Sequence, residues 1–281
     1  MSNRSVQQAD LAALQAAYPH LFSVRWATRA KAVGLVLSVL GLFIFGLIWL
    51  GFSPMAIIHG AERLRIILGL MFPPSAGELF PTYVKALAQT LAIAFLGTLL
   101  ASLIAFPLSL LAARNVVNQG VVHFFARRWF DAIRGVDTLI WALVFINVVG
   151  LGPFAGILAV AMSDVGSFGK LFSEVIETAD RKPVEGIVST GGSRSHRLRF
   201  GIVPQVLPIF LSQVLYYFES NTRSATVIGI VGAGGIGLYL SNEINQQNWD
   251  HVSFIILMIL ITVATIDFVS ARIRQLIYSP K

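Results

Sequence analysis

Glu219 and Arg223 are the two residues of this 281-residue sequence whose types and spacing suggest chemistry most directly. They lie four positions apart, so a helix would place the carboxylate and the guanidinium on one face. Ionisable groups in an apolar segment are functional candidates, and a guanidinium offers a fork of donors that fits an oxyanion. We therefore expect a polar pathway lining at the end of this segment, with a self-satisfied ion pair at the outer interface as the alternative. Small polar residues complete the candidate lining: Ser220, Asn221, Ser224 and Thr226.

A glycine-rich run follows this pair. Gly232-Ala-Gly-Gly-Ile-Gly237 satisfies the pattern G-x-G-x-x-G, but a dinucleotide site needs that turn between a strand and a helix. Here the run follows an apolar helix, which argues against a nucleotide site. Either the glycines let helices approach closely, or they form irregular backbone along a pathway. The second interpretation, which we favour, assigns that role to Gly232, Gly234, Gly235 and Gly237.

The inventory of reactive side chains does not support catalysis. The chain has no cysteine, and its five histidines lie outside the long apolar stretches without metal-ligand spacing. No Ser/His/Asp grouping is apparent. We expect no catalytic residue, metal or cofactor on this chain. Because no G-x-x-x-x-G-K-[ST] loop is present, ATP and Mg would have to be bound by a partner chain.

Composition indicates the setting for these residues. Hydrophobic residues make up 56% of the chain and charged residues 12%, about half the share typical of a soluble domain. We therefore predict an all-α integral membrane protein with one transmembrane domain, residues 32–281. Residues 1–31 are polar and do not resemble a cleavable signal. They would form a cytoplasmic amphipathic segment, with a surface helix over residues 5–22.

Apolar stretches of about 20 residues predict the spans. Four are clear, at residues 32–52, 87–111, 202–218 and 252–273, and an external surface helix is expected over 56–72. Residues 139–163 form either one span or two spans that turn at Gly150–Pro153. With two, 17 of the 21 Lys and Arg residues are cytoplasmic, all but Arg63, Arg65, Lys85 and Arg223; with one, the division is 9 inside and 12 outside. We therefore predict six spans, the third and fourth at 134–149 and 153–173, with both termini cytoplasmic.

The loop after the fourth span contains a short predicted helix at residues 183–191. Pro183 suits its first turn, Glu185 would interact with its positive end, and Gly191 would end it. Glu185, Gly191 six residues on, and Pro204 thirteen further on resemble the coupling-helix motif of ABC importer permeases. Gly186 and Ile187 replace the two alanines that are usual in that motif, and Gly201 replaces an isoleucine.

Residues 137–273 resemble one subfamily, the permeases of phosphonate-type ABC importers. The matching runs are Val149–Gly156, Pro183–Ile187, Val203–Pro208, Tyr217–Asn221, Arg223–Val227 and Gly232–Gly237. The resemblance implies a type I ABC importer permease fold in the bacterial cytoplasmic (inner) membrane. It also implies a coupling surface formed by Pro183, Glu185, Gly186, Ile187, Gly191 and Pro204.

Partners and solute follow from the same resemblance. Two copies of the chain would form the pore, two ABC ATPase subunits would dock on the loop helix, and a periplasmic or lipid-anchored binding protein would deliver the solute. That solute would be a phosphonate, phosphite or hypophosphite, carried by alternating access. The alternatives are another solute, such as methionine, betaine or phosphate, a membrane-embedded enzyme, or a passive channel.

Overall fold

The computed structural model describes residues 26–117 and 119–278, and this part of the chain contains helices and no strand. The all-helical prediction is confirmed. The predicted surface helix at 5–22 lies outside the described residues. The chain divides into two units, Met1–Ile66 and Ile67–Lys281, each considered by itself.

The first unit contains α3 (Trp26–Trp49) and most of α4 (Pro54–Leu70). Residues Ala30–Trp49 of α3 are long and apolar enough to cross a membrane. Leu35, Leu42 and Phe43 of α3 are exposed, as expected of a helix whose surroundings are lipid.

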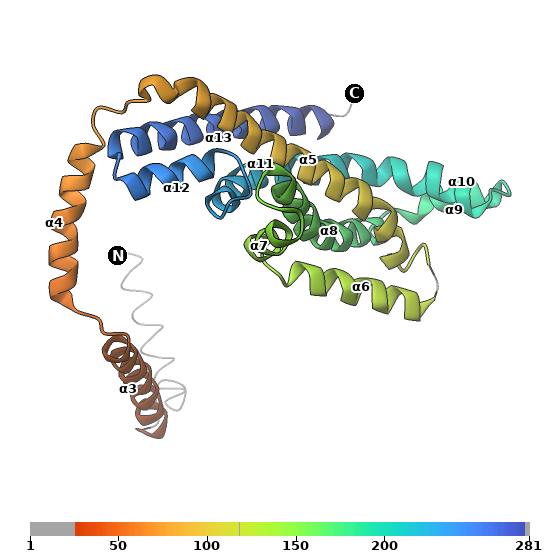
Figure 1. Ribbon diagram of the computed structural model, residues 1–281. Coiled ribbons are helices and arrows are strands. Elements are labelled where there is room, and N and C mark those ends of the chain that lie inside the picture. The colour runs from red at the N-terminus through yellow and green to blue at the C-terminus, as the bar shows by residue number, and fades with distance from the viewer. Residues whose placement is uncertain (1–25, 118, 279–281) are drawn as a thin grey trace, which may run out of the picture. The chain divides into compact units, whose positions relative to one another are not determined.

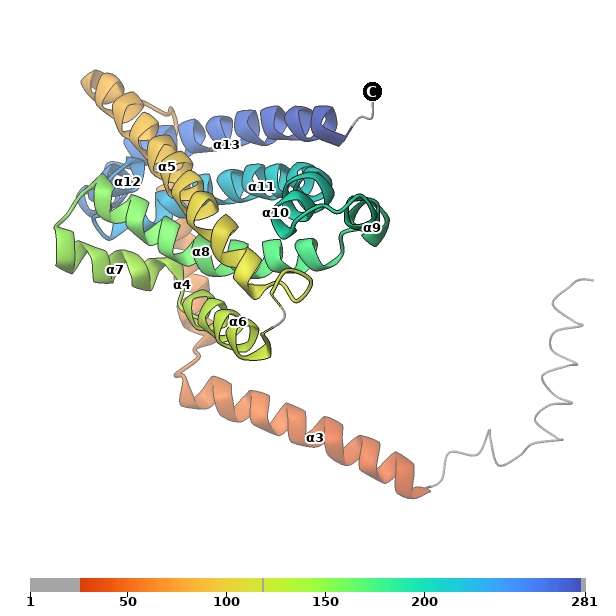
Figure 2. The same ribbon diagram turned by 90° about the vertical axis from the view of Figure 1, so that its right-hand side faces the viewer.

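The second unit is a bundle built around α5, α8, α11 and α13. In both views α5 lies against α8, and α11 lies beside α13 (Figures 1 and 2). The elements in chain order are η1 (Gly77–Leu79), α5 (Phe80–Ala112), α6 (Gly120–Arg134), α7 (Thr138–Val149), α8 (Pro153–Glu177), α9 (Arg181–Ser189), α10 (Arg194–His196), the π-helical turn η2 (Arg197–Ile202), α11 (Val203–Ile230), α12 (Ile236–Gln246) and α13 (Trp249–Tyr278).

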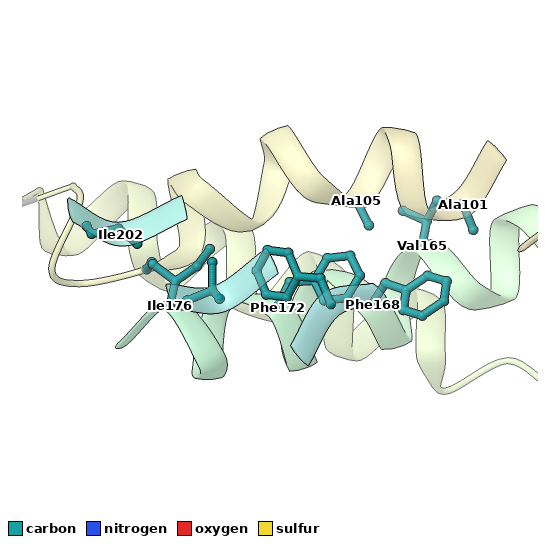
Figure 3. Packing of buried hydrophobic residues seen from close by; sticks show 10 residues of the cluster. Ala101, Ala105, Val165, Phe168, Phe172, Ile176 and Ile202 are labelled. Atoms are coloured by element: carbon teal, nitrogen blue, oxygen red, sulfur yellow. The ribbon is translucent and has the colours of Figure 1, made fainter. Parts of the chain in front are cut away.

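Aromatic side chains of α8 and α11 form the largest buried cluster, against small residues of α5. Phe172 stacks on Phe210 with ring centroids 4.2 Å apart and on Phe168 at 5.0 Å. Ala101 and Ala105 of α5 cover this stack (Figure 3). Small residues at such contacts let helices approach closely, which is how helices pack in membranes.

The predicted break before Pro153 is confirmed. Helix α7 ends at Val149 and α8 begins at Pro153, with positive φ angles of 90° at Gly150 and 138° at Gly152. Helix α7 has only 12 residues, about 18 Å, which is short of the roughly 30 Å hydrocarbon core. Five helices among the described residues are long enough to span, and α6 with α7, bent by 85°, can count as a sixth, broken span.

Helix α11 differs most from its prediction. It does not end near residue 218 but continues to Ile230, and the helix that follows the break, α12, packs against α5 and α13. Tyr239 of α12 meets Tyr83 of α5 edge-on at 6.0 Å. Thus α11 and α12 together replace the single predicted span.

Candidate functional site

Helix α9 is the predicted coupling helix, and the structure starts it two residues earlier, at Arg181. Pro183 is in the first turn as predicted. The prediction for Glu185 was wrong, because the first turn holds no acidic residue and Asp180 caps the helix by accepting the Lys182 N–H at 3.1 Å. A cap from the residue before the first turn satisfies donors that Glu185, one turn further on, does not reach. The helix ends at Ser189, and Gly191 follows with φ of 78°.

One face of α9 packs against the turn η2. Val184 and Ile187 point at Gly201, where an added Cβ would lie 3.1 Å from Val184 Cγ2 and 3.3 Å from Ile187 Cδ1. The departure from the usual isoleucine at position 201 therefore has a packing reason. Opposite this contact, Glu185 and Gly186 are exposed and free to meet a partner.

Gln205 of α11, which the sequence reasoning missed, ties α9 to the bundle. Its Oε1 accepts the Asp180 N–H at 2.9 Å, and its Nε2 donates to the carbonyl oxygens of Asp180 at 3.1 Å and Gly201 at 2.6 Å. Pro204 precedes it in the first turn of α11. The amide thus fixes the start of α9 to the start of α11.

The end of α8 is anchored in a similar way. Glu177 accepts the backbone N–H of Arg114 at 2.8 Å and Nη2 of Arg127 at 2.9 Å, while Asn115 Nδ2 donates to the Ile176 carbonyl at 2.6 Å. These contacts join the α5–α6 connection to the base of α8. Helix α9 therefore lies between two helix ends that are both hydrogen-bonded in place.

Four charged side chains form a cluster between α11 and α13. Arg274 Nη1 donates to Glu219 Oε2 at 3.1 Å, and Arg223 lies 3.9 Å from Glu219 Oε1 and 3.7 Å from Asp267 Oδ1. Two carboxylates thus offset two guanidinium groups, which lowers the cost of charge inside an apolar bundle.

This pair was predicted to lie at the outer mouth, and the structure places it near the end of α13. Arg274 lies four residues before the end of α13, whereas the start of α13 packs beside the start of α5 through Phe254 and Phe80. The far end of α5 meets the base of α8 next to α9. Glu219 and Arg223 therefore lie toward the end of α13, away from the contact between its start and the start of α5.

The other predicted lining residues divide into two groups. Asn221 and Thr222 are buried, and Asn221 Nδ2 donates to Asp164 Oδ2 of α8 at 2.5 Å and to Thr98 Oγ1 of α5 at 2.8 Å. Asn221 therefore joins three helices inside one bundle, and it gives Asp164 a partner that the sequence did not indicate. Three residues are half-buried on the same helix: Ser220, Ser224 and Thr226.

The glycine run is irregular backbone packed inside the bundle. Gly234 and Gly235 are buried with φ of 84° and 82°, and a Cβ on Gly234 would lie 2.9 Å from the Pro153 nitrogen. A Cβ on Gly237 would lie 1.9 Å from the Thr226 carbonyl oxygen. A Cβ at Gly235 would lie 2.4 Å from Thr90 Oγ1, and one at Gly232, which is half-buried with φ of 101°, would lie 2.4 Å from Leu151 Cδ2. An added Cβ thus meets backbone at Gly234 and Gly237 and a side chain at Gly232 and Gly235.

A polar cluster at the start of α5 also escaped the sequence reasoning. Tyr83 hydrogen-bonds to Glu243 Oε1 at 2.9 Å and to His251 Nδ1 at 2.8 Å, and Asn248 donates to Glu243 Oε2 at 2.7 Å. Glu243 is only 5% exposed, so its carboxylate is stabilised by these partners. Their separation of 160 residues in the sequence gave no local signal.

Comparison with known proteins identifies the family. The family of binding-protein-dependent transport system inner membrane components matches residues 105–279. HtxC of Stutzerimonas stutzeri is 40% identical over 222 residues, which cover 79% of this chain and 78% of that protein. The chain belongs to this family. The permease is therefore the pore-forming membrane subunit of an ABC importer, a multi-pass protein as its apolar helices require.

Further relatives and solved structures agree with this assignment. PtxC of Stutzerimonas stutzeri, a phosphite transport system permease protein, is 32% identical over 256 residues, 90% of the permease and 91% of PtxC. The phosphate-import permease protein PhnE of Mycolicibacterium smegmatis is 34% identical over 247 residues, 88% of the permease but 46% of PhnE. A chain of the inward-facing methionine ABC transporter MetNI superposes with a TM-score of 0.64 at 16% identity, covering 73% of the permease and 100% of that chain. The predicted type I ABC importer fold is confirmed.

Proposed function

We propose that this permease imports a small phosphorus oxyanion, a phosphonate, phosphite or hypophosphite, across the bacterial cytoplasmic (inner) membrane. Two copies form the pathway by alternating access, two ATPase subunits hydrolyse ATP with Mg on the cytoplasmic side, and an external binding protein delivers the solute. The chain itself has a transport role and no catalytic one. Phosphate is the second candidate, because one relative is a phosphate-import permease.

The observation that carries the proposed solute is the similarity to PtxC over nine-tenths of both chains. Phosphite, phosphonate, hypophosphite and phosphate share oxygens on phosphorus that accept hydrogen bonds from guanidinium groups. Arg223 supplies such a group on α11, and half of its side chain is exposed. With two copies of the chain, two Arg223 side chains would face one pathway, together with Glu219, Ser220, Ser224 and Thr226.

Uptake of an anionic solute into a cell requires a source of energy, which the proposed ATPase would supply. Moving one negative charge into a cell with a negative interior costs about 2.3 kcal/mol per 100 mV, so accumulation needs a source of work. Helix α9 is the proposed receiver of that work. Because it is hydrogen-bonded to α11 through Gln205 and follows the anchored end of α8, a push on Glu185 or Gly186 would reach both helices.

Transport by the reconstituted complex tests this proposal. The permease, its ATPase and its binding protein are placed in proteoliposomes, and ATP-driven uptake of radiolabelled phosphite is measured. Unlabelled methylphosphonate, hypophosphite, phosphate and methionine are added as competitors. We expect competition from the phosphorus compounds and none from methionine. Competition by methionine alone would contradict the proposed solute class, and uptake without ATP would indicate a channel.

A further inference from the structure

The contacts of Arg223 differ from those of the other members of the α11–α13 cluster. Glu219 is 13% exposed and receives a hydrogen bond from Arg274 at 3.1 Å. Within residues 26–117 and 119–278, the guanidinium of Arg223 makes no hydrogen bond, only the two ion pairs at 3.7 and 3.9 Å. Its five N–H donors are therefore held near negative charge but are not used.

Asp267, the ion-pair partner of Arg223, also has an atom that lacks a hydrogen bond. Its side chain is 42% exposed overall, but Oδ1, the atom that faces Arg223, is buried and has no hydrogen-bond partner. A buried carboxylate oxygen without a donor is costly, so this arrangement needs an explanation. Arg223 attracts this oxygen by charge at 3.7 Å without closing a hydrogen bond.

We infer that Asp267 is a gating and specificity-determining residue, which competes with the transported oxyanion for Arg223 at the inner end of the pathway. In the empty protein, Asp267 and Glu219 offset the charges of Arg223 and Arg274. An arriving oxyanion takes the free donors of Arg223 and replaces Asp267 as its counter-charge. Asp267 then draws Arg223 back, which releases the oxyanion toward the cytoplasm.

Competition of this kind serves transport because a solute must bind well enough to enter and weakly enough to leave. Arg223 alone would hold an oxyanion tightly, and the long pair with Asp267 lowers that affinity. Glu219 cannot take this part, since its carboxylate is already hydrogen-bonded to Arg274. The inference rests on the proposed function, because it needs an anionic solute that passes Arg223.

Two substitutions of Asp267 should shift the dissociation constant of phosphite in opposite directions. Asp267→Asn removes the competing charge, so phosphite should bind about fivefold more tightly and the maximal uptake rate should fall. Asp267→Glu extends the carboxylate toward Arg223 by one methylene, so phosphite should bind more weakly. Glu174→Gln is the matched control, since it also removes one carboxylate but from an exposed position without an ion pair in the described part of the chain.

The experiment measures equilibrium binding of radiolabelled phosphite to the permease–ATPase complex in nanodiscs without binding protein, and uptake in proteoliposomes. Co-purification with the ATPase checks assembly. For either Asp267 variant that assembles, an unchanged dissociation constant, or a shift opposite to the one predicted for that variant, would overturn the gating role. If Arg223→Ala still lowers uptake in that case, the proposed function stands. If Arg223→Ala binds and transports phosphite normally, the oxyanion role of Arg223 fails as well.

Discussion

The side-chain amide of Gln205 brackets the backbone of Asp180: it accepts the Asp180 N–H at 2.9 Å and donates to the Asp180 carbonyl at 3.1 Å. Asp180 is the N-cap of α9, and Gln205 lies in the first turn of α11. The bracket makes the loop between two long helices stiff at the point where it turns back into the bundle. If α9 receives the ATPase as proposed, stiffness at this point would determine how well a push on α9 reaches α11.

Gln205→Ala should therefore uncouple the transporter. It removes three hydrogen bonds, each contributing about 1 kcal/mol, and leaves the Asp180 backbone to water. We expect roughly three- to tenfold less phosphite imported per ATP hydrolysed, measured in proteoliposomes. Gln205→Glu keeps the acceptor and loses the donor, so it should give an intermediate ratio; a normal ratio in both variants would show that the bracket is not needed.

The exposed face of α9 gives a second prediction. Glu185→Lys with Gly191→Pro reverses one charge and disrupts the positive-φ turn at Gly191. We expect loss of ATPase co-purification and of uptake, while the variant still inserts in the membrane, as followed by membrane fractionation. Persistent uptake would show that the ATPase docks elsewhere.

Packing of the glycine run gives a third prediction. Gly237→Ala would place a Cβ 1.9 Å from the Thr226 carbonyl oxygen, so backbone must move, at a cost of about 1–3 kcal/mol. The melting temperature of the purified permease should fall by several degrees. Gly120→Ala is the control, because an added Cβ there meets nothing within 4 Å. Equal melting temperatures for the two variants would contradict the close packing.

The buried hydrogen bonds of Asn221 give a fourth prediction. Asn221→Ala leaves the Asp164 carboxylate, which is 5% exposed, without its donor, and an unsatisfied buried group costs about 1–3 kcal/mol. The melting temperature should fall, while Ser220→Ala, at a half-buried neighbouring position, should have little effect. Full stability of Asn221→Ala would mean that water or a shift of α8 satisfies Asp164.

The side of the membrane on which each loop lies gives a fifth prediction, and the absence of native cysteine makes it simple to measure. Ser189→Cys in α9 should react with a membrane-impermeant maleimide only after the membrane is opened, and Gln246→Cys at the end of α12 should react from outside. Labelling of Ser189→Cys in intact cells would refute the assignment of α9 to the cytoplasmic side.

Elements with local signals were predictable from the sequence. The turn before Pro153 and the end of α9 two residues before Gly191 depend on glycine and proline, whose backbone preferences act within a few residues. The helix in the predicted coupling loop was predictable for the same reason, with its start displaced because Asp180, three residues before Pro183, caps the helix.

Features made by distant residues were not predictable in this way. Apolar run length places the end of a helix at the first charged residues, and Glu219 and Arg223 therefore suggested an end to the span. In the structure, Arg274 and Asp267 of α13 balance these charges, and α11 continues for seven residues beyond Arg223. Gln205 gave no signal either, since its partner Asp180 is 25 residues away.

The Gln205–Asp180 bracket has an evolutionary consequence. It closes residues 180–205 into a loop whose two ends are hydrogen-bonded to each other. The segment can therefore be exchanged as one unit. Exchange of residues 180–205 as a whole between related permeases would keep both ends of the segment in register. Because the bracket uses only backbone groups at position 180, any residue except proline can stand there, whereas position 205 must keep an amide side chain.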